Sequence, residues 1–172
     1  MQLLTLHDHR MLPSSALWIC IIRYLSLRKN QLKKANTILI LSVIVYIFAL
    51  TQRSYCTNND CGELGSGLAI VLSGGLGFFL CKACFTWLSN PLLLLAWITF
   101  KWNTKVSFSL NLISLIIASS FLCFEEIIVN EAGTYGEITG YAIGYWAWLL
   151  SIFILLLGNS INLKKKQEYK HE

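Results

Sequence analysis

Two of the six cysteines, Cys81 and Cys84, have the spacing of a redox dithiol or of half a zinc site. A redox dithiol needs an exposed thiolate of lowered pKa, which the neighbouring Lys82 would favour. A zinc site needs four ligands, and the three histidines all lie near the chain ends. On a continuous helix the two cysteines share one face, so we expect them to pack as small hydrophobic side chains. We therefore predict no catalytic residue, no metal site and no bound cofactor.

A second pair, Cys56 and Cys61, lies in a short polar segment between two apolar stretches. If that segment is outside the cytoplasm, its oxidising surroundings permit a disulfide. We predict a Cys56–Cys61 disulfide, with two reduced thiols as the alternative. Because the closed loop is short, the bridge would add at most about 2 kcal/mol of stability.

Carboxylates form a third candidate, since Glu125, Glu126, Glu131 and Glu137 gather in one segment without a basic residue. Paired carboxylates raise one another's pKa, as general acid catalysis or proton relay requires. Acids at a membrane boundary are more often simply solvated, and a transport path needs ionisable groups inside the membrane. Only Lys82 comes close to that, so the pattern does not favour transport.

The elements that must position these residues are four separated apolar stretches. The chain of 172 residues is 55% hydrophobic and 13% charged, and each stretch approaches the ~20 residues that cross a bilayer as a helix. The sequence predicts an all-α fold, a polytopic transmembrane helical bundle with four spans. The apolar cores are 35–51, 67–85, 107–124 and 141–161.

The second stretch is too long for one span, because residues 67–105 as one helix would be about twice as long as the membrane is thick. Proline disfavours helix in the preceding residue and suits a first helical turn. The sequence therefore predicts a span at 67–88, a turn at Ser89 and Asn90, and a short interfacial or re-entrant helix at 91–102. Five spans are the alternative.

Charge alternates between the connections. Lysine and arginine dominate before the first stretch, between the second and third, and after the last, whereas acids dominate the other two connections. The positive-inside rule then gives four spans with both termini cytoplasmic, in a bacterial inner membrane. This placement explains the net charge of +5 without nucleic acid as a partner.

These boundaries divide the chain into a basic cytoplasmic or interfacial segment at 1–34, a four-helix transmembrane domain at 35–162 and a basic cytoplasmic tail at 163–172. An in-plane helix is one reading of 1–34. Translation beginning near Met11 or beyond is the other.

Small residues recur every four positions at Gly136, Gly140 and Gly144, and again at Ser73 and Gly77. Such spacing makes a flat strip on one helix face, which lets another helix approach closely in lipid. We predict helix packing through these residues within the chain, with homodimerisation as the alternative.

Two segments, Trp87–Pro91 and Gly140–Leu149, resemble small uncharacterised bacterial inner-membrane proteins of about four spans. The resemblance covers the chain from Ala35 onward and implies no known activity. In size and layout the chain is also similar to the disulfide-oxidising quinone reductases of the bacterial inner membrane. Those enzymes need two external cysteine pairs to relay electrons to a quinone. With one external pair, the predicted topology leaves that relay incomplete.

We therefore expect a small non-enzymatic integral inner-membrane protein that binds a partner or lipid. Its expected partners are the lipid bilayer and either another membrane protein or a second copy of the chain. One alternative is an immunity-type protein against a membrane-directed toxin, by analogy of size and layout. The other is a quinone-linked thiol oxidoreductase.

Overall fold

The computed structural model describes residues 34–61, 65–77, 81–130 and 132–171, with side chains as far as Lys164. The chain divides into two compact units, Met1–Lys34 and Ala35–Glu172. Apart from Lys34, the predicted basic segment 1–34 lies outside the described residues, so the second unit is the one described below.

Three helices in the described part of the chain are long and apolar enough to cross a membrane, at Lys34–Thr51, Thr104–Cys123 and Ile143–Lys164. The second combines helix α4 (Thr104–Ser120) with the 3-10 helix η3 (Phe121–Cys123), and the third begins helix α5 (Ile143–His171). Helix α5 continues beyond the membrane-spanning length, so the predicted tail at 163–172 is helical through His171.

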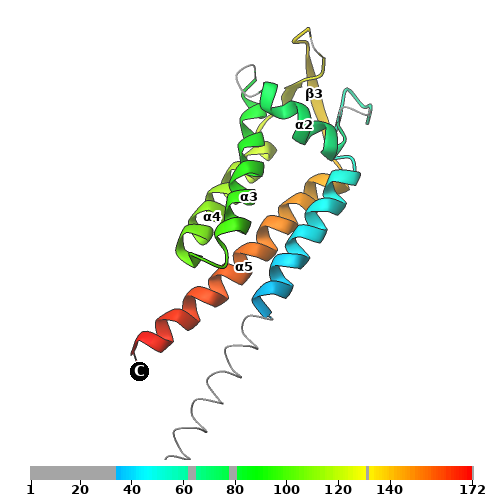
Figure 1. Ribbon diagram of the computed structural model, residues 1–172. Helices are drawn as coiled ribbons and strands as arrows, with labels where there is room; N and C mark the ends of the chain where they lie inside the picture. The colour runs from blue at the N-terminus through cyan, green and yellow to red at the C-terminus, as the bar shows by residue number, and fades with distance from the viewer. Residues whose placement is uncertain (1–33, 62–64, 78–80, 131, 172) are drawn as a thin grey trace, which may run out of the picture. The chain divides into compact units, whose positions relative to one another are not determined.

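The second apolar stretch forms three helices. Helix α2 (Gly67–Gly77) lies across the end of the bundle beside the sheet, as Figure 1 shows. The 3-10 helix η2 (Ala83–Leu88) then continues directly into α3 (Ser89–Thr99). The predicted span at 67–88 is therefore wrong, because α2 ends at Gly77. Four glycines among its eleven residues weaken α2 as a helix. The short helix predicted at 91–102 is present as α3, which begins at Ser89 and ends at Thr99.

The expected turn before Pro91 does not form, because a side chain replaces the missing backbone donor. Pro91 has no N–H to give to the carbonyl of Trp87, one turn back. The side-chain amide of Asn90 donates to that carbonyl instead, at 3.2 Å. Pro91 also lies in the first turn of α3, where its ring is tolerated.

A small sheet, which the all-α prediction did not include, covers one end of the helices. Strands β1 (Tyr55–Thr57) and β2 (Glu126–Ile128) both pair antiparallel with the central strand β3 (Tyr135–Tyr141). Exposed residues of β3 such as Glu137 alternate with more buried ones such as Ile138. That period of two is typical of a half-buried strand.

The interior has two parts, one between the helices and one under the sheet. Between the long helices lie Leu93, Ala96, Phe100, Ile152 and Leu155, all at most 2% exposed.

Polar side chains are buried among these helices and join them. The hydroxyl of Ser42 donates to the carbonyl of Ser151 at 2.8 Å, and the amide of Asn111 donates to the carbonyl of Ile152 at 3.1 Å. In lipid, such bonds contribute to helix association.

Under the sheet, a second cluster contains Cys81, Ala83, Phe121, Ile127 and Tyr145.

Candidate functional site: a disulfide beside an apolar cavity

Cys81 and Cys84 form a disulfide at the start of η2. We expected two separate thiols packed within a span, and the structure corrects this, because the chain breaks before Cys81 rather than at Asn90. The backbone N–H of Cys84 donates to Sγ of Cys81 at 3.1 Å. A donor at this position would favour a Cys81 thiolate once the disulfide is opened.

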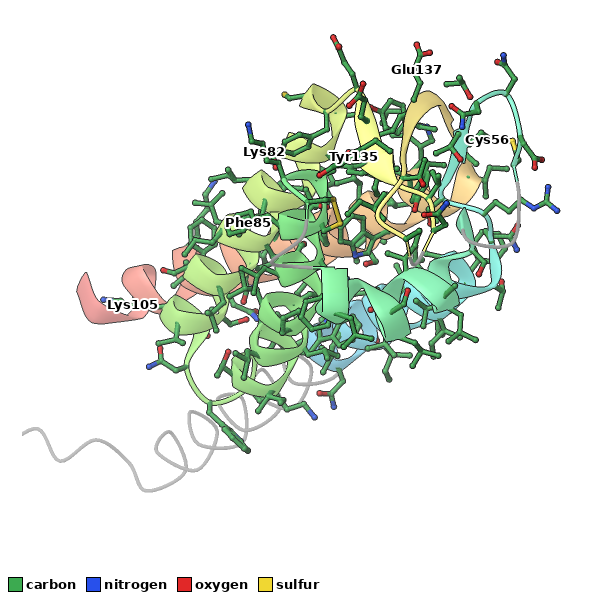
Figure 2. The ribbon with its side chains drawn as sticks, turned by 90° about the horizontal axis from the view of Figure 1, so that it is seen from above. Cys56, Lys82, Phe85, Lys105, Tyr135 and Glu137 are labelled. Atoms are coloured by element: carbon green, nitrogen blue, oxygen red, sulfur yellow. A yellow bond between two sulfur atoms is a disulfide. The ribbon has the colours of Figure 1, made fainter. Side chains whose placement is uncertain are left out.

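The two sulfurs have different surroundings. Cys81 is 6% exposed and packs with Phe121, Ile127 and Tyr145 under the sheet. Cys84 is partly exposed and lines a cavity of about 580 Å³. Lys82, between the two cysteines, points outward from the end of the domain that carries the disulfide (Figure 2).

The cavity lies between α2, the end of the first long helix, η2 and the start of α5. Its walls are mostly aliphatic and aromatic, and its volume falls within the range of small-molecule sites. Residues that line it beside Cys84 include Leu50, Val71, Trp87, Tyr145 and Trp148.

Helix α2 lies directly over Trp87 and Cys84, because glycines form its inner face. The indole N–H of Trp87 donates to the carbonyl of Val71 at 3.0 Å. A Cβ at Gly75 would be 3.2 Å from the Trp87 ring, and one at Gly77 would be 3.2 Å from Sγ of Cys84. Gly77 therefore does lie at a close contact, which it makes with Cys84 of the disulfide.

The other residue of that predicted pair behaves differently. Ser73 is exposed, and its hydroxyl donates to the carbonyl of Ala69 in its own helix at 2.7 Å.

Hydrogen bonds occupy most polar groups of the cavity wall. The hydroxyl of Tyr46 donates to Oδ1 of Asn90 at 3.1 Å, while the hydroxyl of Tyr145 donates to the carbonyl of Ala118 at 3.1 Å. The buried indole nitrogen of Trp148 has no acceptor among the described residues. The cavity therefore suits a largely apolar molecule with few polar groups.

Cys56 and Cys61 also form a disulfide, and a tight turn explains it. Thr57 and Asp60 exchange backbone hydrogen bonds of 2.9 and 2.8 Å around Asn58 and Asn59, whose φ angles of 52° and 62° fit a two-residue hairpin turn. The cysteines flank this turn as the next cross-strand pair, with their Cα atoms 4.2 Å apart. Asparagine tolerates such positive φ angles better than most residues.

Both disulfides belong to the end of the domain that carries the sheet. Tyr55, beside Cys56, packs against Phe121, with ring centroids 5.6 Å apart, and Phe121 packs in the same cluster as Cys81. In the view of Figure 2, Tyr135 and Glu137 of β3 lie between Cys56 and Lys82. Burial raises the pKa of the Tyr55 hydroxyl, so this tyrosine is a neutral wall residue rather than a base.

The predicted glycine strip is not a helical strip. Gly136 and Gly140 lie in strand β3, where a Cβ at Gly140 would meet nothing within 4 Å. A Cβ at Gly136 would lie 2.6 Å from Val129, on the neighbouring segment. Gly144 lies in the first turn of α5 and closely approaches the backbone of Arg53, two residues after the end of the first long helix. The four-residue spacing therefore reflects a strand followed by a helix start.

Among the described carboxylates, Glu126 and Glu137 are cross-strand partners in β2 and β3. Glu125, Glu126 and Glu137 are exposed on or beside the sheet, and Glu131 lies outside the described residues. No three histidine, cysteine, aspartate or glutamate side chains in the described ranges gather closely enough to hold a metal.

Comparisons with models of protein families, with curated proteins and with solved structures find no match to this chain. The site must therefore be interpreted from its own geometry. Sequence reasoning noticed the spacing of Cys81 and Cys84 but missed their position at a helix end beside a cavity. The signal available for it was the glycine content of 67–77, which argues against a continuous span.

Proposed function

We propose that this protein is a membrane thiol oxidoreductase that transfers electrons from a dithiol to a quinone through Cys81 and Cys84. One observation carries the proposal: a disulfide whose Cys84 sulfur lines an apolar cavity at the end of a helical membrane domain. The expectation of a non-enzymatic protein assumed that these cysteines were packing residues inside a span. That assumption does not hold, so the quinone-linked alternative becomes the better interpretation.

The chemistry balances with the groups that the site offers. A substrate thiolate attacks the Cys81–Cys84 disulfide and forms a mixed disulfide, which the second substrate thiol resolves. Cys81 and Cys84 are then both thiols, and the substrate has lost two electrons and two protons. Re-formation of the Cys81–Cys84 disulfide passes two electrons and two protons to a quinone, which becomes a hydroquinone.

Each side of the pair has a role in this scheme. Cys84 meets the quinone, because it is the cysteine that lines the cavity. The backbone N–H of Cys84 stabilises a thiolate at Cys81. Trp87 and Tyr46 supply an aromatic wall for a planar ring.

The proposal includes four crossings of a bacterial inner membrane, with both termini cytoplasmic. Three crossings are the long helices, and the remaining one, second in chain order, is the helical segment Ala83–Thr99, which has only 17 residues. Its first six residues are 3-10 helix, which rises about 2.0 Å per residue. The whole segment therefore reaches about 28 Å, close to the hydrocarbon thickness of about 30 Å. This topology puts both disulfides on the periplasmic side, where an oxidised pair persists.

The function is tested with purified protein in detergent, which should catalyse the reduction of a short-chain ubiquinone by dithiothreitol. The rate is measured as the loss of quinone absorbance. We expect catalysis by the parent and only the uncatalysed rate with Cys84→Ser or Cys81→Ser. Cys123→Ser is the matched control, because Cys123 is an exposed free cysteine. Equal rates for the parent and the Cys84→Ser variant would contradict the proposal.

The Cys56 and Cys61 pair needs its own variant, because the quinone reductases that the chain resembles in size and layout use two pairs. A Cys56→Ser, Cys61→Ser double variant is expected to oxidise dithiothreitol normally, since a small dithiol reaches Cys81 and Cys84 directly. Slower oxidation of a protein dithiol by this variant would assign the turn disulfide to electron entry.

A further inference from the structure

We propose that helix α2 lies in the membrane leaflet at the sheet end of the bundle and inserts its leucines among the lipid acyl chains. Its outward face carries Leu68, Leu72 and Leu76, which are 53%, 74% and 81% exposed. They follow one another at four-residue spacing, so they form a single stripe along the helix. This inference concerns the protein's surface and does not depend on the redox chemistry.

Both ends of α2 are tied to the ends of longer helices. At its start, the N–H of Gly67 donates to the carbonyl of Gln52 at 2.9 Å, and a Cβ at Gly67 would be 2.9 Å from Cα of Leu50. At its end, Gly77 contacts Cys84 at the start of η2. Because those helix ends mark the membrane boundary, α2 is held at the level of that boundary.

The composition of α2 suits hydrocarbon rather than water. It has no charged residue, and its only polar side chain, Ser73, already donates its hydroxyl hydrogen within the helix. Beyond its helical hydrogen bonds, two donors of its first turn are also paired: the N–H of Gly67 donates to the carbonyl of Gln52, and the N–H of Ala69 donates to the hydroxyl of Ser66. An exposed uncharged leucine stripe in water would be costly.

The neighbouring sheet provides the contrast. Exposed residues of its strands include Glu126, Glu137 and Thr139, which need water. Figure 1 shows α2 crossing the end of the bundle beside β3, so an apolar surface and a polar one adjoin there. Ile47 and Phe48 of the first long helix are exposed as well, and that helix ends beside the start of α2, where a Cβ at Gly67 would meet Leu50. We therefore assign acyl chains, and not a protein partner, as the occupant of the leucine stripe.

Depth-dependent fluorescence quenching tests this assignment in the full-length chain. Leu72→Cys and Leu76→Cys are made separately in a Cys20→Ser, Cys123→Ser background, so that a bimane label attaches to the new thiol while both disulfides stay intact. Labelled protein is placed in phosphatidylcholine nanodiscs. Quenching by nitroxide on the lipid acyl chain is compared with quenching by aqueous iodide, and Glu137→Cys on β3 serves as the water-facing control.

We expect acyl-chain nitroxide to quench both α2 labels strongly and iodide to quench them weakly, with the reverse order at position 137. Iodide quenching of the α2 labels equal to that at position 137 would overturn the proposal, because the stripe would then face water. Protection of both α2 labels from both quenchers would also overturn it, since a protein partner or second copy would cover the stripe. The redox assay on the same preparations separates this outcome from the fate of the proposed function.

Discussion

Asn90 illustrates how one side chain can change the path of the backbone. Its amide nitrogen replaces the hydrogen bond that Pro91 cannot make, and its carbonyl oxygen accepts from Tyr46 on another helix. Both polar atoms of the side chain are therefore used at a position that is 5% exposed. The same asparagine that indicated a turn in the sequence instead keeps the helix continuous and joins it to its neighbour.

Asn159 is the opposite case, and it gives a prediction. It is fully buried in α5, and neither amide atom has a partner among the described residues. An unpaired buried amide costs stability, and leucine has a similar volume. We expect Asn159→Leu to raise the free energy of unfolding by about 1 kcal/mol, measured by thermal unfolding in detergent.

Asn111→Leu is the control for that measurement. Asn111 is equally buried, but its amide nitrogen donates to the carbonyl of Ile152. The loss of this bond offsets the benefit, so no gain in stability is expected. A lower stability of Asn159→Leu than of the parent would mean that water or another group satisfies Asn159.

At the scale of elements, the start of α5 depends on Gly144. The N–H of Gly144 donates to the carbonyl of Arg53 at 2.7 Å, and a Cβ on Gly144 would lie 2.6 Å from that same oxygen. Backbone cannot move aside as a flexible side chain can. We expect Gly144→Ala to destabilise the protein by about 1–3 kcal/mol, because α5 must shift away from the first long helix.

Gly140→Ala is the matched control, since an added Cβ there meets nothing within 4 Å. Alanine is also less costly than glycine within a strand. Its thermal unfolding should match that of the parent within about 0.5 kcal/mol. Equal losses for the two variants would contradict the assignment of the close approach to Gly144 alone.

The sequence was sufficient for some of these elements and not for others. The long helices at Lys34–Thr51 and Ile143–Lys164 agree closely with apolar stretches seen in the sequence, because hydropathy over such lengths dominates local preferences. The sheet could not be predicted in the same way. Strands β1 and β2 have three residues each, and their pairing depends on contacts with a distant segment.

The candidate site could not be recognised in the sequence, because one helix boundary was placed wrongly. Placing the break at Pro91 put Cys81 and Cys84 inside a span, where they would pack. The actual break lies between Gly77 and η2, and its position depends on tertiary contacts of α2 with Trp87. Neither the cavity nor the exposed face of α2 is visible in the sequence, since both arise from helices that meet after folding.

At the scale of the whole molecule, the charges separate along the helices. Lys101 lies in the connection between α3 and α4, and Lys105 lies in the first turn of α4, whereas Glu125 and Glu137 lie at the sheet end. A bilayer with a basic cytoplasmic side and an acidic external side fits this arrangement only if α3 crosses it. The topology therefore depends on whether a helix of 17 residues spans the hydrocarbon.

Accessibility of single cysteines in bacterial spheroplasts decides this point. Lys101→Cys and Glu137→Cys are compared in the Cys20→Ser, Cys123→Ser background, because both positions are exposed and lie outside the long helices. With four crossings, a membrane-impermeant maleimide labels Cys at position 137 in intact spheroplasts, and labels Cys at position 101 only after permeabilisation. Labelling of both positions in intact spheroplasts would mean that α3 does not cross the membrane, and the reverse pattern would mean that the sheet end faces the cytoplasm, because β1 and β3 pair in one sheet. In that reverse case both disulfides would lie on the cytoplasmic side, where an oxidised pair does not persist, and the proposed electron transfer would lose its compartment.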